Sequence, residues 1–300
     1  MVFPLALQWL NGCQEHSILL DEGRNHLNLL SVCHTLTFSS LKATFCFSPC
    51  LLKSRCVSRG LVCPNGARYS DRAFYHLFGI TRFRKLLRTA LLRTPCTTPT
   101  FAALCPDASE LHTYLTFLQD QELLHNEGTV WSRGKRLFHV SDIGHTLEWY
   151  VAEWFRLTET CRSHHVIPVR HGVTFHRSLD VGDIDVVALL DSSWTVTLEC
   201  KSSSHITANE LALFLKRATL LQPAIAVLVI DTPTLSPDGH IRRLNALLAK
   251  NGEEPLLPVA SAEGMYWGAK HMCVTCVSQS LPSSLEAVLQ VIEQNISPLT

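Results

Sequence analysis

The clearest pattern of apolar and polar positions begins after Ser141. A helix is predicted over residues 142–157, because apolar side chains recur there at three- and four-residue spacings and form one stripe. The stripe consists of Leu147, Tyr150, Val151, Trp154 and Phe155. Three runs with strand-like patterning follow, at residues 165–176, 184–190 and 195–200.

The remaining C-terminal residues alternate between helical and strand patterns. Thr207 or Asn209 caps a predicted helix that continues to Leu221. Residues 224–230 form a short apolar run between two prolines, which is typical of a strand buried on both faces. Three further elements are a helix at residues 241–250, a strand near residues 256–259 and a last helix at residues 285–293. The order α-β-β-β-α-β-α-β predicts an α/β fold, with a mixed sheet flanked by helices.

Residues 66–140 predict a smaller helical segment. A basic helix is expected over residues 70–92, with Gly79 as its weak point. Asp107-Ala-Ser-Glu110 fits a capping box ahead of a helix that ends near Glu122, and a glycine-containing hairpin follows. A helix followed by such a hairpin resembles the second half of a winged helix-turn-helix. Three acids on this helix argue against tight binding in a DNA groove, so a linker or dimerisation module remains an alternative. They are Glu110, Asp120 and Glu122.

Residues 1–65 show no sustained period of 2 or 3.6. We expect an ill-ordered extension or the remnant of a lost domain there. The predicted organisation therefore has three parts. They are residues 1–65, residues 66–140 with the basic helix and the winged-helix-like segment, and residues 141–300 with the α/β domain.

Composition and charge limit the function classes. The chain has 300 residues, of which 46% are hydrophobic, so it can form a substantial core. Its 26 basic and 26 acidic side chains cancel, but residues 53–93 contain ten basic side chains and one acid, Asp71. This stretch suits contact with nucleic-acid phosphates, and a solvated helix face is the alternative.

Twelve cysteines occur without a secretory leader pattern, and no apolar run is long enough to span a bilayer. We expect a cytoplasmic protein with reduced thiols and no membrane partner. Cys273-Val-Thr-Cys276 has CxxC spacing, with His271 nearby, but it lacks a second pair. Small residues at a strand end are the alternative to a zinc site.

Two neighbouring predicted strands carry the candidate chemistry. Because side chains alternate along a strand, Glu199 and Lys201 point away from the core face, and so does Asp185. A short turn joins the two strands into a hairpin, so these side chains share one side of the sheet. The two strings are residues 182–188 (GDIDVVA) and residues 194–201 (WTVTLECK).

Carboxylates flanked by core residues must be paired or bind an ion. A hard cation such as Mg²⁺ or Mn²⁺ would be bound by two carboxylates, a backbone carbonyl and water. We predict Asp185, Glu199 and Cys200 as the metal-binding residues. Lys201 would orient or deprotonate a metal-bound water, or offset charge in the transition state.

This arrangement resembles the PD-(D/E)XK nuclease superfamily. In that superfamily an acid on one strand precedes (D/E)-x-K on the next, and a helix ahead of them carries another acid. Asp185 matches the first acid, and Glu199-Cys200-Lys201 matches (D/E)-x-K. The string GHTLEWYV looks like the preceding helix, with Glu148 as its acid. The resemblance covers residues 143–231 and implies a restriction-endonuclease-like fold.

More narrowly, the three strings look like the nuclease half of CRISPR ancillary effectors, which act in antiviral defence. In those proteins a nucleotide-sensing CARF domain and a winged-helix linker precede the nuclease. Archaeal Holliday-junction resolvases and Mrr-like restriction nucleases have similar strings. Residues 1–100 show no βαβ alternation and no glycine-rich phosphate loop, so we expect no intact sensor here.

The resemblance implies a Mg²⁺- or Mn²⁺-dependent endonuclease that hydrolyses phosphodiester bonds in DNA or RNA. Asp185, Glu199, Lys201 and Glu148 are its expected catalytic residues. Cutting both strands of a duplex with one site each needs two subunits, so a homodimer is an expected assembly. A non-catalytic nucleic-acid-binding or regulatory protein on the same fold is the alternative, and a purely structural or dimerisation protein is a third class.

Other polar residues near these strings are weaker candidates. Lys216 and Arg217 lie on the helix after the Glu-Cys-Lys strand, where superfamily members often place a residue that contacts substrate. Asp183 is expected to be a neighbouring acid rather than a ligand, and the thiol of Cys200 a packing group in the core. Four histidines ahead of Asp185 are expected at the surface; they are His164, His165, His171 and His176.

Overall fold

The computed structural model describes most of the chain from Arg72 onward. The described residues are 53–54, 72–157, 166–174, 182–190, 194–203, 205–232, 237–268, 271–277 and 280–295. Apart from Lys53–Ser54, the predicted N-terminal part of residues 1–65 lies outside them. His164, His165 and His176 also lie outside the described residues.

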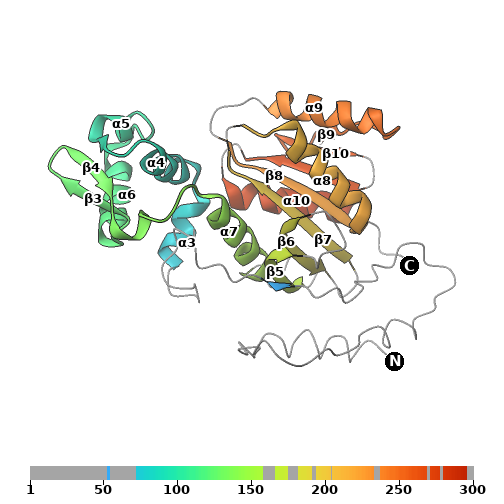
Figure 1. Cartoon of the computed structure of the whole chain (residues 1–300), viewed down its shortest axis with the longest axis horizontal. Helices are drawn as coiled ribbons and strands as arrows, with labels where there is room; N and C mark the ends of the chain where they lie inside the picture. Colours follow the sequence, from blue (N-terminus) through green and yellow to red (C-terminus); the bar gives the residue numbers. More distant parts are fainter. Residues whose placement is uncertain are drawn as a thin grey trace.

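A mixed β-sheet forms the larger part of the molecule (Figure 1). In sheet order, its strands are β1 (Lys53–Ser54), β5 (Val166–Thr174), β6 (Asp183–Leu190), β7 (Trp194–Lys201), β8 (Ile225–Ile230), β11 (Met272–Cys276), β10 (Met265–Gly268) and β9 (Leu257–Pro258). Strands β5, β6 and β7 are neighbours in antiparallel pairs, whereas β8 is parallel to both β7 and β11. The predicted mixed sheet is therefore present.

Helices cover both faces of this sheet. On one face lie α7 (Gly144–Leu157) and α10 (Leu281–Asn295), and on the other lie α8 (Ala208–Leu221) and α9 (Pro237–Lys250). All six residues of β8 are buried, because its side chains enter the two cores alternately. Val227 belongs to the core beneath α7 and α10, and Leu228 to the core beneath α8 and α9. The α/β class predicted from the sequence is confirmed.

The predicted order of elements is incomplete after α9. The sequence pattern predicts one strand there, whereas the structure has β9, β10 and β11 before α10. Strand β11 is buried at all five positions and pairs in parallel with β8. Its residues, Met-Cys-Val-Thr-Cys, contain only one β-branched aliphatic side chain, so hydrophobic patterning alone does not identify it as a central strand.

A smaller unit with its own sheet precedes α7 (Figure 1). Its three strands pair in the order β2, β4 and β3, all antiparallel. Along the chain its elements are α4 (Thr81–Leu92), β2 (Cys96–Thr97), α5 (Thr98–Ala102), α6 (Ala108–Asp120), β3 (Leu124–Glu127) and β4 (Val130–Arg133). The helix and hairpin predicted from residues 107–138 are thus present, and an additional strand completes their sheet.

Helix α6 begins at a side-chain cap. The carboxylate of Asp107 accepts hydrogen bonds from the backbone N–H groups of Ser109 and Glu110, at 2.9 and 3.0 Å. The other half of the predicted capping box is replaced, because the Glu110 carboxylate instead accepts hydrogen bonds from Tyr114 and Arg82. The predicted start of this helix is therefore confirmed, although only the Asp107 half of the capping box forms.

The basic helix predicted over residues 70–92 is divided into two. Helix α3 (Arg72–Gly79) ends where Gly79 passes α7 so closely that an added Cβ would lie 2.7 Å from the Tyr150 hydroxyl. Ile80 is extended, and α4 then begins at Thr81. A side chain at position 79 would collide with Tyr150, so this glycine is required by close packing.

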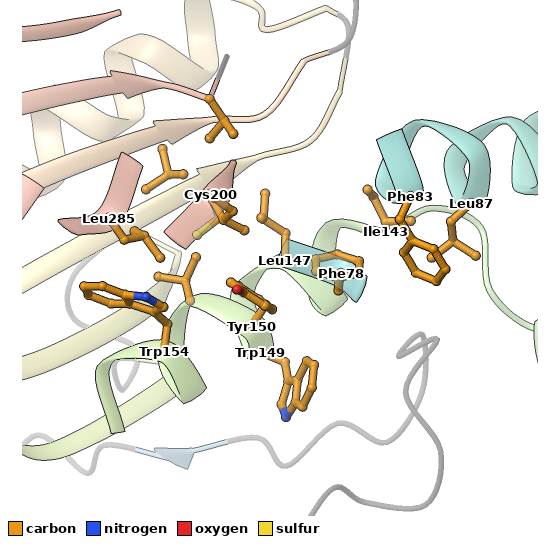
Figure 2. Packing of buried hydrophobic residues seen from close by; sticks show 14 of the residues in the cluster. Phe78, Phe83, Leu87, Ile143, Leu147, Trp149, Tyr150, Trp154, Cys200 and Leu285 are labelled. Carbon is orange, nitrogen blue, oxygen red and sulfur yellow. The ribbon is translucent and has the colours of Figure 1, made fainter. Parts of the chain in front are cut away.

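One hydrophobic core continues from the smaller unit into the large sheet (Figure 2). Phe78 of α3 packs against Tyr150 of α7, with ring centroids 5.5 Å apart, and both are fully buried. Figure 2 shows Phe83 and Leu87 of α4 at one end of the drawn residues, and Leu285 of α10 and Trp154 of α7 at the other. The core therefore crosses the boundary predicted at residue 140.

Part of the basic stretch contributes to internal contacts. Arg84 is fully buried, and Arg88 is nearly so. Interpreting residues 53–93 as one exposed basic face is therefore wrong for these two arginines. Among the residues that the structure describes, no helix is long and apolar enough to cross a bilayer.

Candidate active site

The hairpin of β6 and β7 positions the candidate acids. Its antiparallel register pairs Val186 with Leu198, and Asp185 and Glu199 come next to this last pair along their strands. Leu198 and Cys200 enter the core beneath α7 and α10. Glu199 therefore points to the opposite face, on which α8 lies.

Asp185 is tied directly to the Glu-Cys-Lys segment. The backbone N–H of Cys200 donates a hydrogen bond to Oδ2 of Asp185, with an N···O distance of 2.7 Å. Burial raises the pKa of Asp185, and the charges of Lys201 and Arg217 together with this hydrogen bond oppose the rise. The bond fixes the carboxylate of Asp185 beside the end of β7.

Glu199 is a buried acid between two cations. Its side chain is 4% exposed, its Oε1 lies 2.6 Å from a guanidinium nitrogen of Arg217, and its Oε2 lies 3.9 Å from Nζ of Lys201. Neither oxygen accepts a hydrogen bond of ordinary geometry from the described part of the chain, so the contact with Arg217 is an ion pair without hydrogen-bond alignment. Burial and the neighbouring charge of Asp185 raise the pKa of Glu199 to about 8.

Lys201 lies between two carboxylates. Its Nζ is 3.9 Å from Oε2 of Glu199 and also 3.9 Å from Oε1 of Glu210 on α8. Glu210 belongs to the capping box of α8, in which the Thr207 hydroxyl accepts from the Glu210 N–H and the Glu210 carboxylate accepts from the Thr207 N–H. The start of α8 therefore presents an acid to Lys201.

Glu148 reaches the same site from α7. Its carboxylate is 15% exposed and lies 3.2 Å from Nδ1 of His145, one turn earlier on the helix. Burial raises its pKa to about 7, and the negative charge of Asp185 adds to the rise, while His145 and Lys201 oppose it. Glu148 is therefore electrostatically coupled to Asp185 and Lys201, and its ion-pair contact is with His145.

The donor set fits a hard divalent cation. The half-buried Asp185 and the buried Glu199 have raised pKa values and repel each other, while Arg217 and Lys201 partly offset the charge of Glu199. The Cys200 thiol lies in the apolar core, where burial raises its pKa, so this residue offers only its backbone carbonyl to a metal. Within the described ranges, no three His, Cys, Asp or Glu side chains converge as a ligand cluster, so a cation would rely on two carboxylates, a carbonyl and water.

The weaker candidate site residues differ in their burial and in whether they lie beside Glu199. Asp183 is exposed at the start of β6, and Lys216 is exposed on α8, whereas Arg217 lies beside Glu199. His171, on β5, is half-buried rather than at the surface, and its pKa is lowered to about 4 by burial and by electrostatic interactions with Arg156, His145 and Arg170. The surface prediction for His171 is therefore wrong.

The CxxC pair does not form one ligand set. Cys273 and Cys276 are three residues apart on β11, so their side chains lie on opposite faces of the sheet and enter different cores. Both thiols are free and buried, which raises each pKa to about 12. Packing residues, the alternative to a zinc site, are what the structure has here, and Cys276 is the last residue of the strand.

Two residues of the site were not singled out from the sequence. Glu210 could have been found from Thr207-x-x-Glu210, a capping-box string directly after the Glu-Cys-Lys strand. His145 could have been found from its three-residue spacing to Glu148 on a predicted helix. In both cases the local pattern suggests only helix stabilisation, and the tertiary fold brings the side chain to the site.

No protein-family model and no curated protein sequence matches the chain. Among solved structures, the chain is similar to protein VC1899 from Vibrio cholerae, with a TM-score of 0.43 and 15% sequence identity. The similarity covers 75% of this chain and 55% of that protein, so the chain spans little more than half of that protein's length.

Proposed function

We propose that this protein is a divalent-metal-dependent nuclease that hydrolyses phosphodiester bonds in DNA or RNA. The observation that carries the proposal is the position of Asp185, Glu199 and Lys201 at one end of the β6–β7 hairpin, with Glu199 buried between the cations Arg217 and Lys201. The helix with Glu148 precedes the strand with Asp185 and the strand with Glu199-Cys200-Lys201, and this order supports the proposal together with the sequence resemblance to PD-(D/E)XK nucleases.

The proposed mechanism assigns separate roles to the residues of the site. Asp185, Glu199 and the Cys200 carbonyl would hold Mg²⁺ or Mn²⁺, which supplies a more acidic bound water and charge neutralisation at the scissile phosphate. The ammonium group of Lys201 orients the attacking water or stabilises the phosphorane-like charge. Glu148, with a pKa raised to about 7, can accept a proton from that water near neutral pH.

The smaller unit supports a nucleic-acid substrate. Its element order, helix-strand-helix-helix-strand-strand with the first strand beside the last, resembles that of a winged helix. The Glu110 side chain on α6 is taken up by contacts with Arg82 and Tyr114, so it does not present a free acid to DNA. We propose that this unit guides substrate to the site or orients it.

The decisive experiment measures cleavage by the full-length chain. Plasmid DNA, single-stranded DNA and RNA are incubated with Mn²⁺, Mg²⁺ or EDTA, and Glu199→Gln and Asp185→Asn are assayed beside the wild type. We expect metal-dependent cleavage that falls about 1,000-fold or more in both variants, because each removes a metal-binding charge.

Asp183→Asn is the matched control, since it removes an exposed acid two positions from Asp185 on the same strand. It should cleave at the wild-type rate. Equal cleavage by wild type and both site variants would contradict the proposal. Circular dichroism of each variant separates loss of chemistry from loss of fold.

One observation favours a second function. A guanidinium nitrogen of Arg217 lies 2.6 Å from Oε1 of Glu199 and compensates its charge. A protein on this fold that no longer binds metal would keep such an ion pair. A non-catalytic nucleic-acid-binding protein would bind equally well in EDTA, with an affinity that falls steeply as salt rises. Binding without cleavage in every metal condition would favour this alternative.

A further inference from the structure

Arg84 connects three segments from inside the protein. Its guanidinium group is fully buried and donates to both carboxylate oxygens of Asp231, at 2.8 and 3.2 Å. It also donates to the carbonyls of Phe78 and Gly79 at the end of α3, at 2.7 and 2.8 Å, and to the Thr81 hydroxyl at 3.2 Å. The corner between α3 and α4 is thus joined to the residue that follows β8.

Arg88, one turn later on α4, contacts the same acid. It donates to the carbonyl of Asp231 at 2.9 Å and to its Oδ2 at 3.3 Å. Burial lowers the pKa of Arg88, while the charges of Asp231 and Asp142 oppose this shift. Asp142 in turn accepts a hydrogen bond from the Gly144 N–H at the start of α7, so Arg88 lies between the end of β8 and the helix that carries Glu148.

Asp231 continues this network to the candidate active site. Its backbone N–H donates to the carbonyl of Lys201, with an N···O distance of 2.8 Å. The start of α7 also approaches this point, because a Cβ on Gly144 would lie 3.5 Å from Oγ of Ser202, the residue after Lys201. Lys201, the last residue of β7, is therefore hydrogen-bonded to Asp231, and the residue after it lies close to the start of α7.

The charges in this network compensate one another. Burial alone would raise the pKa of Asp231, but the attraction and hydrogen bonds of Arg84 and Arg88 bring it below its usual value. A buried ion pair of this kind is costly to desolvate, and apolar residues of similar size would often stabilise a fold as well. Its directional bonds, however, fix orientation in a way that apolar packing does not.

We propose that Asp231, held by Arg84 and Arg88, is a positioning residue that fixes the backbone at Lys201 and thereby couples the smaller unit to the active site. The proposal rests on the proposed nuclease function for its catalytic consequence. A displacement of α4, such as one caused by substrate bound to the smaller unit, reaches Lys201 through two side chains and one backbone hydrogen bond. The ammonium group of Lys201 then moves relative to Glu199.

The test uses Arg88→Gln in the full-length chain, because Arg88 is partly accessible and its loss leaves the Arg84–Asp231 pair intact. Hydrogen exchange of the Asp231 amide reports directly on its bond to Lys201, and we expect exchange about tenfold faster than in the wild type. In the Mn²⁺ cleavage assay we expect kcat to fall about 10- to 100-fold with KM nearly unchanged, since the lysine is misplaced and binding is not.

Glu110→Gln is the control, because it breaks an ion pair of the smaller unit at its surface, the one with Arg82, and should alter neither readout. Faster exchange with an unchanged kcat would overturn the proposal, since the network would then serve stability only. Unchanged exchange would overturn it as well. If the wild type cleaves nothing, the nuclease function fails, and the exchange at Asp231 alone decides whether the coupling exists. Asp231→Asn gives a second, stronger disruption for the same measurements.

Discussion

Buried carboxylates dominate the site at the scale of single residues. Glu148 and Glu199 have pKa values raised to about 7 and about 8, chiefly by burial and then by the charge of Asp185. A carboxyl group whose pKa is higher in the folded protein favours the protonated folded state. Such a group contributes fully to the stability of the folded protein below its unfolded pKa. This contribution is lost as the pH rises through its folded pKa.

The metal-free protein should therefore lose stability as the pH rises from about 6.5 to about 8, which lies above the range in which His171, with its pKa lowered to about 4, adds stability as the pH rises. Added Mn²⁺ should reverse this loss at about pH 8, because a cation stabilises the ionised carboxylates. Thermal unfolding followed by fluorescence, with and without Mn²⁺, measures both effects. Glu199→Gln should flatten the pH profile and reduce the Mn²⁺ effect, and a wild-type Tm that rises over this range without metal would contradict the prediction.

The residue pattern predicted much of the site. Strand alternation predicted Asp185, Glu199 and Lys201 on one face, and the hairpin pairs Val186 with Leu198, directly beside Asp185 and Glu199. The short bond from the Cys200 N–H to Asp185 and the ion pair of Glu199 with Arg217 could not be predicted. The first contact depends on where the pairing of β6 with β7 ends, and the second on the angle at which α8 packs on the sheet.

At the scale of elements, α8 supplies both Glu210 and Arg217 to the site. Its first turn is held by the reciprocal bonds of Thr207 and Glu210. The sequence predicted this start through Thr207. It did not predict β10 and β11, because short strands with cysteine, methionine and threonine lack a distinctive period.

Thr207→Ala should destabilise the protein by about 1 kcal/mol, because it leaves the Glu210 N–H without its side-chain acceptor. Urea unfolding measures the free energy difference. Thr219→Ala is the matched control on the exposed face of the same helix and should change stability little. An equal effect of both substitutions would show that the cap contributes nothing beyond helix propensity.

At the scale of the whole molecule, the two sheets share one core. Phe74 and Phe78 of α3 contact aromatic side chains of α7, and the same core extends to Leu285 of α10. The sequence predicted a boundary at residue 140 from a change in pattern, but periodicity carries no information about which apolar faces meet. The continuous core favours cooperative unfolding of both parts.

Phe78→Ala should cost about 3–5 kcal/mol and lower the stability of both parts together. Urea unfolding is followed by tryptophan fluorescence, to which Trp131 in the smaller unit and Trp154 on α7 contribute, and by far-UV circular dichroism. Coincident transitions are expected. Leu92→Ala, on the exposed face of α4, is the control and should leave the midpoint unchanged. Two separated transitions in the wild type would contradict the cooperative core.

The short strand β9 has a consequence for association between copies of the chain. It forms one edge of the large sheet with only two residues, and one of them, Pro258, has no N–H to donate to a further strand. An edge with unpaired backbone groups is a template for aggregation, and a proline there interrupts it. At this edge, therefore, a strand of a second molecule cannot easily pair with the sheet. The aliphatic central strands stay buried within one copy of the chain.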